Sequence, residues 1–216
     1  MNIKNYLDST YLKTAKQAGI SDSDDQELVA KYIQEAIEYQ FKLIMIRPKH
    51  VALAKKMITE SKSKVTIGTV IDFPKGKGGM DKKLSQAQKA IADGADDLDF
   101  VVNYKAFKKG EFDLVKQEII EATKLGLLHH KIVKWIIEVA ALNNKQIIQL
   151  SALIKNTVIT HFTENDYQQV FVKSSTGFYK TKDGKPNGAT IPAIKMMLEN
   201  ASPLPIKAAG GVRTYA

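Results

Sequence analysis

Short apolar runs alternate with amphipathic segments along the whole chain. Most of the apolar runs are nearly continuous, which is typical of parallel strands that are covered on both faces. We predict strands over the following runs: Tyr6–Thr10, Phe41–Ile46, Lys64–Ile71, Asp97–Val102, Ile132–Val139, Gln169–Lys173 and Pro205–Ala208. The segments between them carry apolar residues at helical spacing. We predict helices over these segments: Gln26–Gln40, Val51–Ser61, Met80–Asp93, Glu111–Leu125, Asn144–Lys155 and Thr190–Glu199. Gly94 and Gly126 fall where a glycine that ends a helix belongs.

Repeated βα units form either an open doubly wound sheet or a closed (β/α)8 barrel. Charged residues stand at the ends of many predicted strands: Asp8, Asp99, Glu138, Lys173 and Lys207. Active sites of barrels draw residues from many strand ends, whereas open sheets concentrate theirs at one switch point. No G-x-G-x-x-G motif follows the first strand. We therefore predict an α/β fold, a (β/α)8 TIM barrel. Only seven strands are predicted before Ala216, so we expect the last strand and helix of the barrel to be missing from this chain. No linker or break in composition occurs, so residues 1–216 are predicted to form a single barrel domain.

Composition narrows the class of protein. The 216 residues are 44% hydrophobic and 25% charged, as in an ordinary soluble protein with a proper core. No apolar run approaches the roughly 20 residues that cross a bilayer, and the N-terminus lacks the apolar segment of a secretory signal. We expect a cytoplasmic protein without a membrane partner. Cysteine is absent, which excludes a thiolate nucleophile and thiolate zinc sites. The four histidines show no metal-ligand spacing, so we predict no metal: His50, His129, His130 and His161.

The net charge of +9 could indicate a nucleic-acid partner. The lysines, however, are scattered, and the only arginines are Arg47 and Arg213. Arginine is the residue favoured for bidentate contacts to phosphate and guanine. We interpret the charge as a solvated surface and expect no nucleic-acid partner.

Two lysines end predicted strands just before glycine-containing turns. Lys173 ends the apolar run in QVFVKSSTGF, and Lys207 ends the run in PIKAAGG. Burial disfavours the charged form of a lysine, which lowers its pKa and frees the amine as a nucleophile. The turns offer backbone N–H groups and hydroxyls to an anion. The pattern indicates an amine that attacks a phosphorylated carbonyl compound.

Charged side chains within apolar strands need partners, since an unpaired buried charge is very costly. In DDLDFVVNY, alternation places Asp97 and Asp99 on one face of the strand. Lys134 and Glu138 lie in VKWIIEVA. These residues could form structural ion pairs or a catalytic network. For Lys134 and Glu138 both interpretations remain open. For Asp99, together with the two strand-end lysines, we favour catalysis, because a carboxylate can relay protons between neighbouring ammoniums through water.

Glycines near the strand ends are candidates for phosphate binding. Gly177 follows a run of hydroxyl residues, and Gly210 and Gly211 follow Lys207. We favour phosphate binding over a plain turn for the paired glycines, on the precedent of barrel enzymes. The segment FPKGKGG, residues 73–79, is a flexible loop above the barrel mouth or a polar turn, and we favour the turn.

Segments of the chain resemble the deoxyribose-phosphate aldolase family, in the same order and over essentially the whole length. They are LDSTYLK, IMIRPKHVALAKK, VTIGTVIDFPKG, DDLDFVVNY, VKWIIEVAAL, FVKSSTGF and PIKAAGGVRT. The resemblance implies a (β/α)8 barrel and a metal-free class I aldolase that needs no cofactor. It implies reversible cleavage of 2-deoxy-D-ribose 5-phosphate to D-glyceraldehyde 3-phosphate and acetaldehyde, in deoxyribonucleoside catabolism.

The resemblance also implies roles for individual residues. Lys173 matches the lysine that forms the Schiff base, Lys207 matches the second lysine that tunes it and relays protons, and Asp99 matches the aspartate of the proton relay. Positions that match substrate or phosphate contacts are Asp8, Thr10, Thr176, Gly177, Gly210, Gly211, Val212 and Arg213. Lys134 and Glu138 are expected to form a supporting network around them.

The chain departs from the family in three places. Ser9 stands where many relatives have histidine, and Ser174 stands where threonine is commoner. Relatives also continue beyond GGVRT with a helix, an eighth strand carrying a phosphate loop, and a final helix. We therefore expect weak phosphate binding and unpaired sheet edges, which are compatible with a homodimer. The alternative function is a catalytically impaired barrel that only binds phosphosugars or a partner protein.

Overall fold

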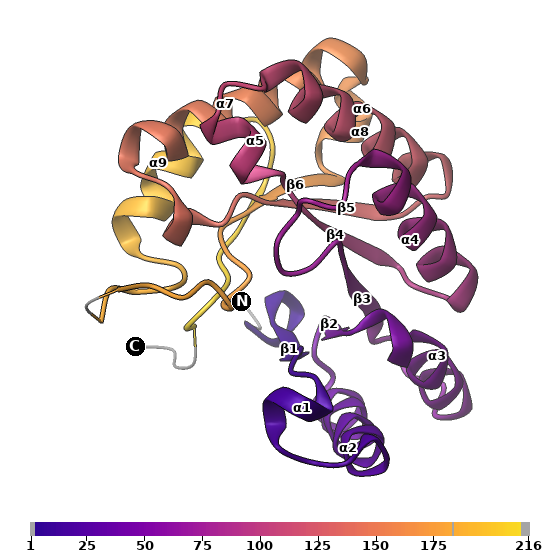
Figure 1. The fold of residues 1–216 in the computed structure, drawn as a ribbon. Helices are drawn as coiled ribbons and strands as arrows, with labels where there is room; N and C mark the ends of the chain where they lie inside the picture. The colour runs from indigo at the N-terminus through magenta and orange to yellow at the C-terminus, as the bar shows by residue number, and fades with distance from the viewer. Residues whose placement is uncertain (1–2, 183, 213–216) are drawn as a thin grey trace. The chain divides into compact units, whose positions relative to one another are not determined.

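The computed structural model describes residues 3–182 and 184–212 (Figure 1). Its internal contacts divide the chain into two compact units. Unit 1 comprises Met1–Val70 and Gln88–Leu98, and unit 2 comprises Ile71–Ala87 and Asp99–Ala216. Each unit is described by itself below. The prediction of one domain stays a prediction.

Unit 1 is built on the first strands, which pair in parallel. These are β1 (Asp8–Tyr11), β2 (Leu43–Ile46) and β3 (Thr66–Ile71, whose last residue lies in unit 2). All four residues of β2 are buried, as its continuous apolar run predicts. The helical elements are η1 (Ile3–Tyr6), α1 (Ala15–Ala18), α2 (Asp22–Tyr39), η2 (Pro48–His50) and α3 (Val51–Glu60).

Helix α2 shows why the sequence forms these elements. The side chain of Ser21 accepts a hydrogen bond from the Asp24 N–H and caps the first turn. Val29, Ile33 and Ala36, spaced by four and three residues, bury one face of the helix. The helix therefore begins four residues before the predicted start at Gln26.

Unit 2 carries the later strands, which also pair in parallel. These are β5 (Ile132–Ile136), β6 (Val170–Lys173) and β7 (Ile206–Lys207). The strand β4 (Asp97–Val101) begins in unit 1 and ends in unit 2. Next to its start the Asp96 N–H donates to the Ile67 carbonyl, and just after its end the Val102 N–H donates to the Ile136 carbonyl. The strand order in the sheet is therefore that of the sequence, β1 to β7.

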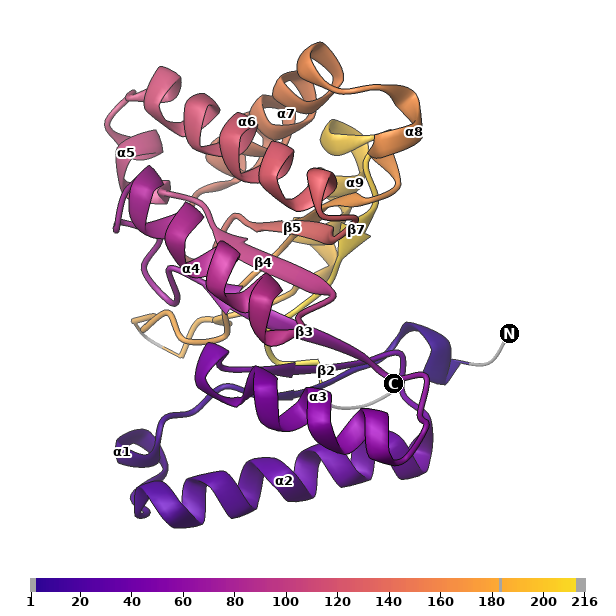
Figure 2. The same ribbon diagram turned by 90° about the vertical axis from the view of Figure 1, so that its right-hand side faces the viewer.

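The main helices of unit 2 lie on one face of its strands. Helices α6 (Phe112–Leu128), α7 (Asn144–His161) and α9 (Ile191–Ala201) pack side by side against β5, β6 and β7, respectively (Figures 1 and 2). The remaining elements are α5 (Tyr104–Lys108), η3 (Val139–Ala141), α8 (Glu164–Tyr167) and α4 (Met80–Asp93, which ends in unit 1). We call the face of the strands away from α6, α7 and α9 the inner face.

The core between strands and helices centres on Trp135. Its side chain is fully buried, stacks on Phe100 with ring centroids 5.1 Å apart, and donates from Nε1 to Thr123 Oγ1 of α6 at 3.0 Å. Because successive side chains alternate across a strand, Lys134 and Asp99 must point to the inner face. The predicted alternation in DDLDFVVNY is confirmed.

Two local predictions need correction, and two short helices of unit 2 were not predicted. The predicted strand Ile132–Val139 ends at Ile136, because Glu138 adopts a left-handed backbone with φ +58° and η3 follows it. Gly126 does not end a helix: it is buried within α6, which continues to Leu128. The short helices α5 and α8 lie outside the predicted helices. Gly94, in contrast, does follow the end of α4 with φ +105°.

Candidate active site

Asp99 forms the centre of a buried charged cluster on the inner face of unit 2. Its Oδ1 accepts a hydrogen bond from Lys134 Nζ at 3.1 Å, and its Oδ2 accepts one from Lys173 Nζ at 2.5 Å. The exposed fractions of the three residues are 0% for Asp99, 3% for Lys134 and 6% for Lys173. Three charged groups thus share one site from which water is nearly excluded.

The two ammoniums decide the protonation state of Asp99. Burial alone raises the pKa of this carboxyl, but the nearby charges of Lys134 and Lys173, and their hydrogen bonds, outweigh burial and hold the pKa below its usual value of 3.8. Asp99 is therefore a carboxylate at neutral pH. It can hold Lys173 in place and stabilise a positive charge that forms on its nitrogen.

Lys207 lies on the strand next to Lys173. The two residues are direct partners in the register of β6 and β7, and the Lys207 carbonyl accepts from the Ser174 N–H at 3.0 Å. Partners in register point to the same face of a sheet. The backbone therefore directs both strand-end lysines to the inner face.

Glu138 does not join the Asp99 cluster. Its Oε2 accepts a hydrogen bond from the hydroxyl of Thr176, and its Oε1 has no hydrogen-bond partner in the part of the chain that the structure describes. Burial raises its pKa to about 7, and the hydrogen bonds from Thr176 oppose this shift only in part. The expected network around Lys134 and Glu138 thus separates: Lys134 belongs to Asp99, and Glu138 belongs to the turn after β6.

Two glycine turns face one another beyond the ends of β6 and β7. Gly177 has φ +75° and Gly210 has φ +85°, backbone conformations that favour glycine. A Cβ on Gly177 would lie 3.6 Å from the Cα of Gly210. Ser174 joins the turns, since its Oγ donates to the Ala209 carbonyl and accepts from the Ala209 N–H, both at 2.9 Å.

The remaining residues predicted to contact substrate belong to β1 and to the segment after β7. Asp8 and Thr10 belong to β1 in unit 1, where Thr10 Oγ1 donates to the Asp8 carbonyl at 3.2 Å. In unit 2, Gly211 has φ +77° and Val212 is 61% exposed. Arg213 lies outside the described residues.

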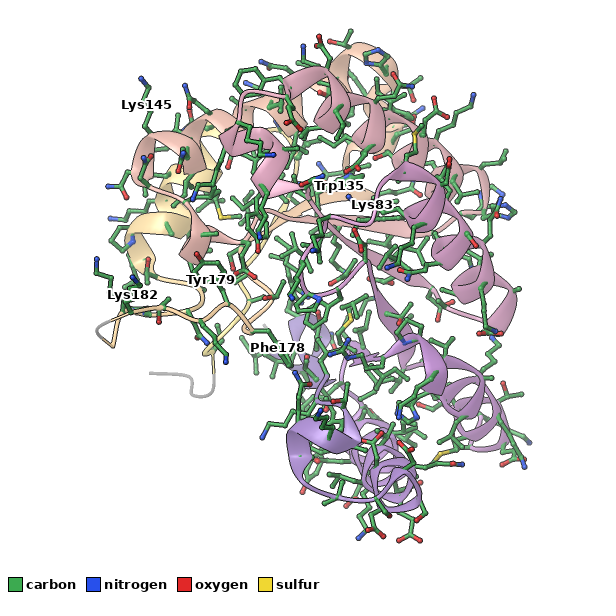
Figure 3. All side chains as sticks on the ribbon, in the orientation of Figure 1. Lys83, Trp135, Lys145, Phe178, Tyr179 and Lys182 are labelled. Atoms are coloured by element: carbon green, nitrogen blue, oxygen red, sulfur yellow. The ribbon has the colours of Figure 1, made fainter. Side chains whose placement is uncertain are left out.

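The segment FPKGKGG after β3 is a hydrogen-bonded turn, as favoured from the sequence. The carboxylate of Asp72 accepts from the Gly78 N–H at 2.6 Å, and its carbonyl accepts from the Gly76 N–H at 2.8 Å. Phe73 packs edge-to-face against Phe178 at 5.0 Å between ring centroids, so this turn contacts the loop after β6. Figure 3 shows Phe178 and Tyr179 on that loop.

A second buried charged cluster in unit 2 was not anticipated from the sequence. Lys83 of α4, 1% exposed, donates to Glu118 of α6 and to the Gly76 carbonyl at 3.0 Å, and lies 3.8 Å from Asp72 (Figure 3). Burial raises the pKa of Glu118, and Lys83 opposes that shift. Helical periodicity could have predicted that Lys83 is buried, because Lys83 shares the spacing of the buried residues Ala87 and Ala90.

Comparison with known proteins identifies the family. Residues 12–215 match the model for the DeoC/LacD family aldolases. The chain belongs to this family. The deoxyribose-phosphate aldolase of Thermococcus gammatolerans is 36% identical over 216 residues, covering all of this chain and 85% of the relative. That of Streptococcus suis is 33% identical over 216 residues, covering all of this chain and 86% of the relative.

Solved structures of aldolases have a similar fold. The aldolase QR15 superimposes with a TM-score of 0.78 at 28% identity, covering 99% of this chain and 83% of that one. A putative deoxyribose-phosphate aldolase from Coccidioides immitis gives a TM-score of 0.76 at 27% identity, covering 99% and 76%. The fold class predicted from the sequence, a (β/α)8 TIM barrel, is confirmed: the described residues form a seven-stranded sheet in sequence order and superimpose on the aldolase QR15. Among the described residues, no helix is long and apolar enough to span a bilayer.

Proposed function

We propose that this DeoC/LacD family aldolase is a class I deoxyribose-phosphate aldolase. It would cleave 2-deoxy-D-ribose 5-phosphate reversibly to D-glyceraldehyde 3-phosphate and acetaldehyde. The observation that carries the proposal is the buried contact between Lys173 Nζ and Asp99 Oδ2, 2.5 Å long, at the end of a strand that leads into paired glycine turns. The two similar proteins named deoxyribose-phosphate aldolase support the choice of substrate.

The reaction begins at the amine of Lys173. The Lys173 ammonium first gives up a proton to water; the neutral amine then adds to C1 of the open-chain sugar, and loss of water gives an iminium. The iminium accepts the electron pair of the C2–C3 bond, so that this bond breaks as the C3 hydroxyl gives up its proton. Glyceraldehyde 3-phosphate leaves and an enamine remains on Lys173. Protonation of the enamine at C2 and hydrolysis of the new iminium release acetaldehyde and regenerate the lysine.

Asp99 serves this sequence in two ways. Its carboxylate lies against Lys173 and can stabilise the positive charge of each iminium, in a site where burial strengthens electrostatic interactions. Through water it can also take the proton of the C3 hydroxyl and return a proton to C2 of the enamine, with Lys207 as the second relay group. Lys134 holds the other carboxylate oxygen at 3.1 Å, so the carboxylate keeps its orientation while Lys173 reacts.

The phosphate is assigned to the glycine turns. Gly177, Gly210 and Gly211 can present backbone N–H groups to an anion without side chains in the way. Thr176, Val212 and Arg213 belong to the same segments. Asp8 and Thr10 are proposed to contact the sugar hydroxyls.

Reductive trapping tests the nucleophile. The protein is incubated with acetaldehyde and borohydride, digested, and mapped by mass spectrometry. A reduced two-carbon adduct is expected on Lys173. Lys173→Arg should abolish trapping, because a guanidinium stays protonated. Lys83→Arg is the matched control, since Lys83 is a buried lysine of unit 2 outside the proposed site.

Two outcomes oppose the proposal. An adduct on other lysines while Lys173 stays free removes the assignment of the nucleophile. Binding of deoxyribose phosphate without turnover, despite trapping at Lys173, favours the alternative of an impaired barrel that only binds the sugar phosphate.

A further inference from the structure

Glu138 occupies a strained position between β5 and β6. Its backbone lies in the left-handed region with φ +58°, which is uncommon for a residue other than glycine. The residues on either side are bound to the end of β6 and to the residue after it: the Ile137 N–H donates to the Lys173 carbonyl and the Val139 N–H donates to the Ser174 carbonyl, both at 2.9 Å. Strained conformations persist where the surrounding structure enforces them, and they cluster at functional sites.

The carboxyl group of Glu138 is buried but bonded to a hydroxyl. The residue is 1% exposed, and its Oε2 accepts from Thr176 Oγ1. The same hydroxyl oxygen accepts from the Phe178 N–H at 3.0 Å. A chain of hydrogen bonds therefore crosses the turn that contains Gly177, from the Phe178 N–H through Thr176 to Glu138. Lys134 and Lys173, the buried ammoniums of this region, are bonded to Asp99 instead.

We propose that Glu138 is a positioning residue for phosphate recognition, acting through Thr176 on the turn that carries Gly177. The inference rests on the proposed function and assigns a role to a carboxylate that its mechanism does not use. The turn is tied further to the second glycine turn, because Asn187 Nδ2 donates to the Gly177 carbonyl at 3.1 Å and Gly188 packs against Gly210. A displacement of Thr176 would therefore disturb the N–H groups of both turns.

The protonation state of Glu138 changes near neutral pH. Burial raises its pKa to about 7, and the hydrogen bonds from Thr176 lower it only in part. The titratable group that interacts with it is Tyr104 of α5, whose own pKa is raised by burial and then by the charges of Glu138 and Tyr179. The backbone of Lys173 in β6 lies alongside Glu138, since the Lys173 carbonyl accepts from the Ile137 N–H. The ionised carboxyl accepts a stronger, charge-assisted hydrogen bond than the neutral one. The turn should be held more firmly as the pH rises through 7.

Comparison of a phosphorylated with an unphosphorylated substrate tests the role. The steady-state constants kcat and KM are measured for 2-deoxyribose 5-phosphate and for 2-deoxyribose, between about pH 6 and 8.5, the range around this titration. At the upper end, Glu138→Leu should raise KM about tenfold more for the phosphorylated sugar than for the unphosphorylated one, as loss of a hydrogen bond to a charged group implies. Glu138→Gln keeps a neutral acceptor and should lose only about threefold.

The pH profile separates positioning from a merely structural role. In the wild-type protein the ratio of the two KM values should shift in favour of the phosphorylated sugar as the pH rises through 7, and Glu138→Gln should lack this step. The substrate phosphate, with a second pKa of about 6, titrates alike in both proteins. Thr176→Val should resemble Glu138→Leu, and the double variant should be no worse than either single variant, because both remove one contact.

A binding measurement keeps the test independent of turnover. The affinity for inorganic sulfate, which does not titrate in this range, is measured by calorimetry for the wild-type protein and Glu138→Gln. Sulfate affinity should rise through pH 7 in the wild-type protein alone. Equal losses for both sugars, or an unchanged pH step in Glu138→Gln, would overturn the inference. If the wild-type protein turns over neither sugar, the proposed function fails, and the sulfate measurement still decides the role of Glu138. If Glu138→Leu does not fold, Thr176→Val and Glu138→Gln carry the test.

Discussion

Replacing Asp99 by asparagine should destabilise the protein and separate trapping from turnover. Asp99 is fully buried and accepts hydrogen bonds from two lysines at 2.5 and 3.1 Å. Asparagine keeps the size of the side chain and one acceptor oxygen, but it leaves two buried ammoniums without a counter-charge. Removing one partner of a buried ion pair costs about 3–5 kcal/mol. We expect the free energy of unfolding to fall by about 3 kcal/mol for Asp99→Asn and by about 5 kcal/mol for Asp99→Leu.

The pH dependence of this loss has a definite sign. Burial raises the pKa of Asp99, but Lys134 and Lys173 outweigh it, so the folded-state pKa lies below the unfolded value of 3.8. A group with a lowered pKa contributes stability that is present above its unfolded pKa and is lost as the pH falls through its folded pKa. The difference in stability between the wild-type protein and Asp99→Asn should therefore be full at pH 7 and shrink below about pH 4.

Asp99→Asn should lower turnover but leave the reductive trapping of Lys173 intact. Loss of a proton-transfer group lowers turnover by about 10²–10⁴-fold. Borohydride trapping at Lys173 should continue, because the nucleophile itself is intact. Urea unfolding, turnover with deoxyribose phosphate and trapping with acetaldehyde are measured on the same preparation. Asp113→Asn, an exposed aspartate of α6, is the control and should change none of them. Full turnover in Asp99→Asn would assign Asp99 to structure, and unchanged stability would refute the argument from buried charges.

Further predictions concern Glu138, Gly188 and Lys83. Burial raises the pKa of Glu138 from 4.5 to about 7, so the folded state holds this proton more tightly than the unfolded chain does. Stability should fall by about 3 kcal/mol as the pH rises from 4.5 to 7, and urea unfolding of Glu138→Gln should lack this slope. Gly188→Ala would place a Cβ 2.0 Å from the Gly210 carbonyl oxygen, so the turn must move. The melting temperature should fall and KM for the sugar phosphate should rise. A variant with wild-type values of both would show that the turn tolerates displacement. Lys83→Met leaves Glu118 buried without its cation and should lower the free energy of unfolding by about 3–5 kcal/mol. The double variant Lys83→Met, Glu118→Leu should recover much of this loss, because it leaves no unpaired buried charge.

The sequence predicts which side chains of β4 and β5 point to the helices and which point to the inner face, because this depends only on alternation along each strand. In β4 and β5 a charged residue alternates with a large aromatic one, and only one face can pack against helices. Phe100 and Trp135 therefore mark the covered face, and Asp99 and Lys134 must share the other. The end of β5 could not be predicted in this way, because the apolar run continues through Ile137 while the backbone turns at Glu138. No feature of the neighbouring sequence predicts that a glutamate adopts a left-handed backbone conformation.

The pairing of the charges depended on register, which periodicity does not determine. Ile136 is the partner of Lys173, and Lys134 is the partner of Phe171, two pairs further back along both strands. Lys134 and Lys173 therefore occupy diagonal positions within reach of one carboxylate on the neighbouring strand β4. Glu138 lies beyond the last pair of the ladder, so its side chain meets the turn after β6. The sequence identified the charged residues at the strand ends, but periodicity alone does not show which of these residues contact one another.

The cluster around Lys83 could have been anticipated from helix periodicity combined with charge. Lys83 lies on the buried face of α4, and Glu118 lies among the buried positions Val115, Ile119 and Ala122 of α6. A charge on an apolar helix face requires a buried partner of opposite sign, and each helix supplies one such residue. The ammonium of Lys83 bonds to the Gly76 carbonyl as well as to Glu118. The same ion pair that joins the two helices therefore fixes the turn after β3, which explains why this glycine-rich segment forms an ordered turn and not a flexible loop.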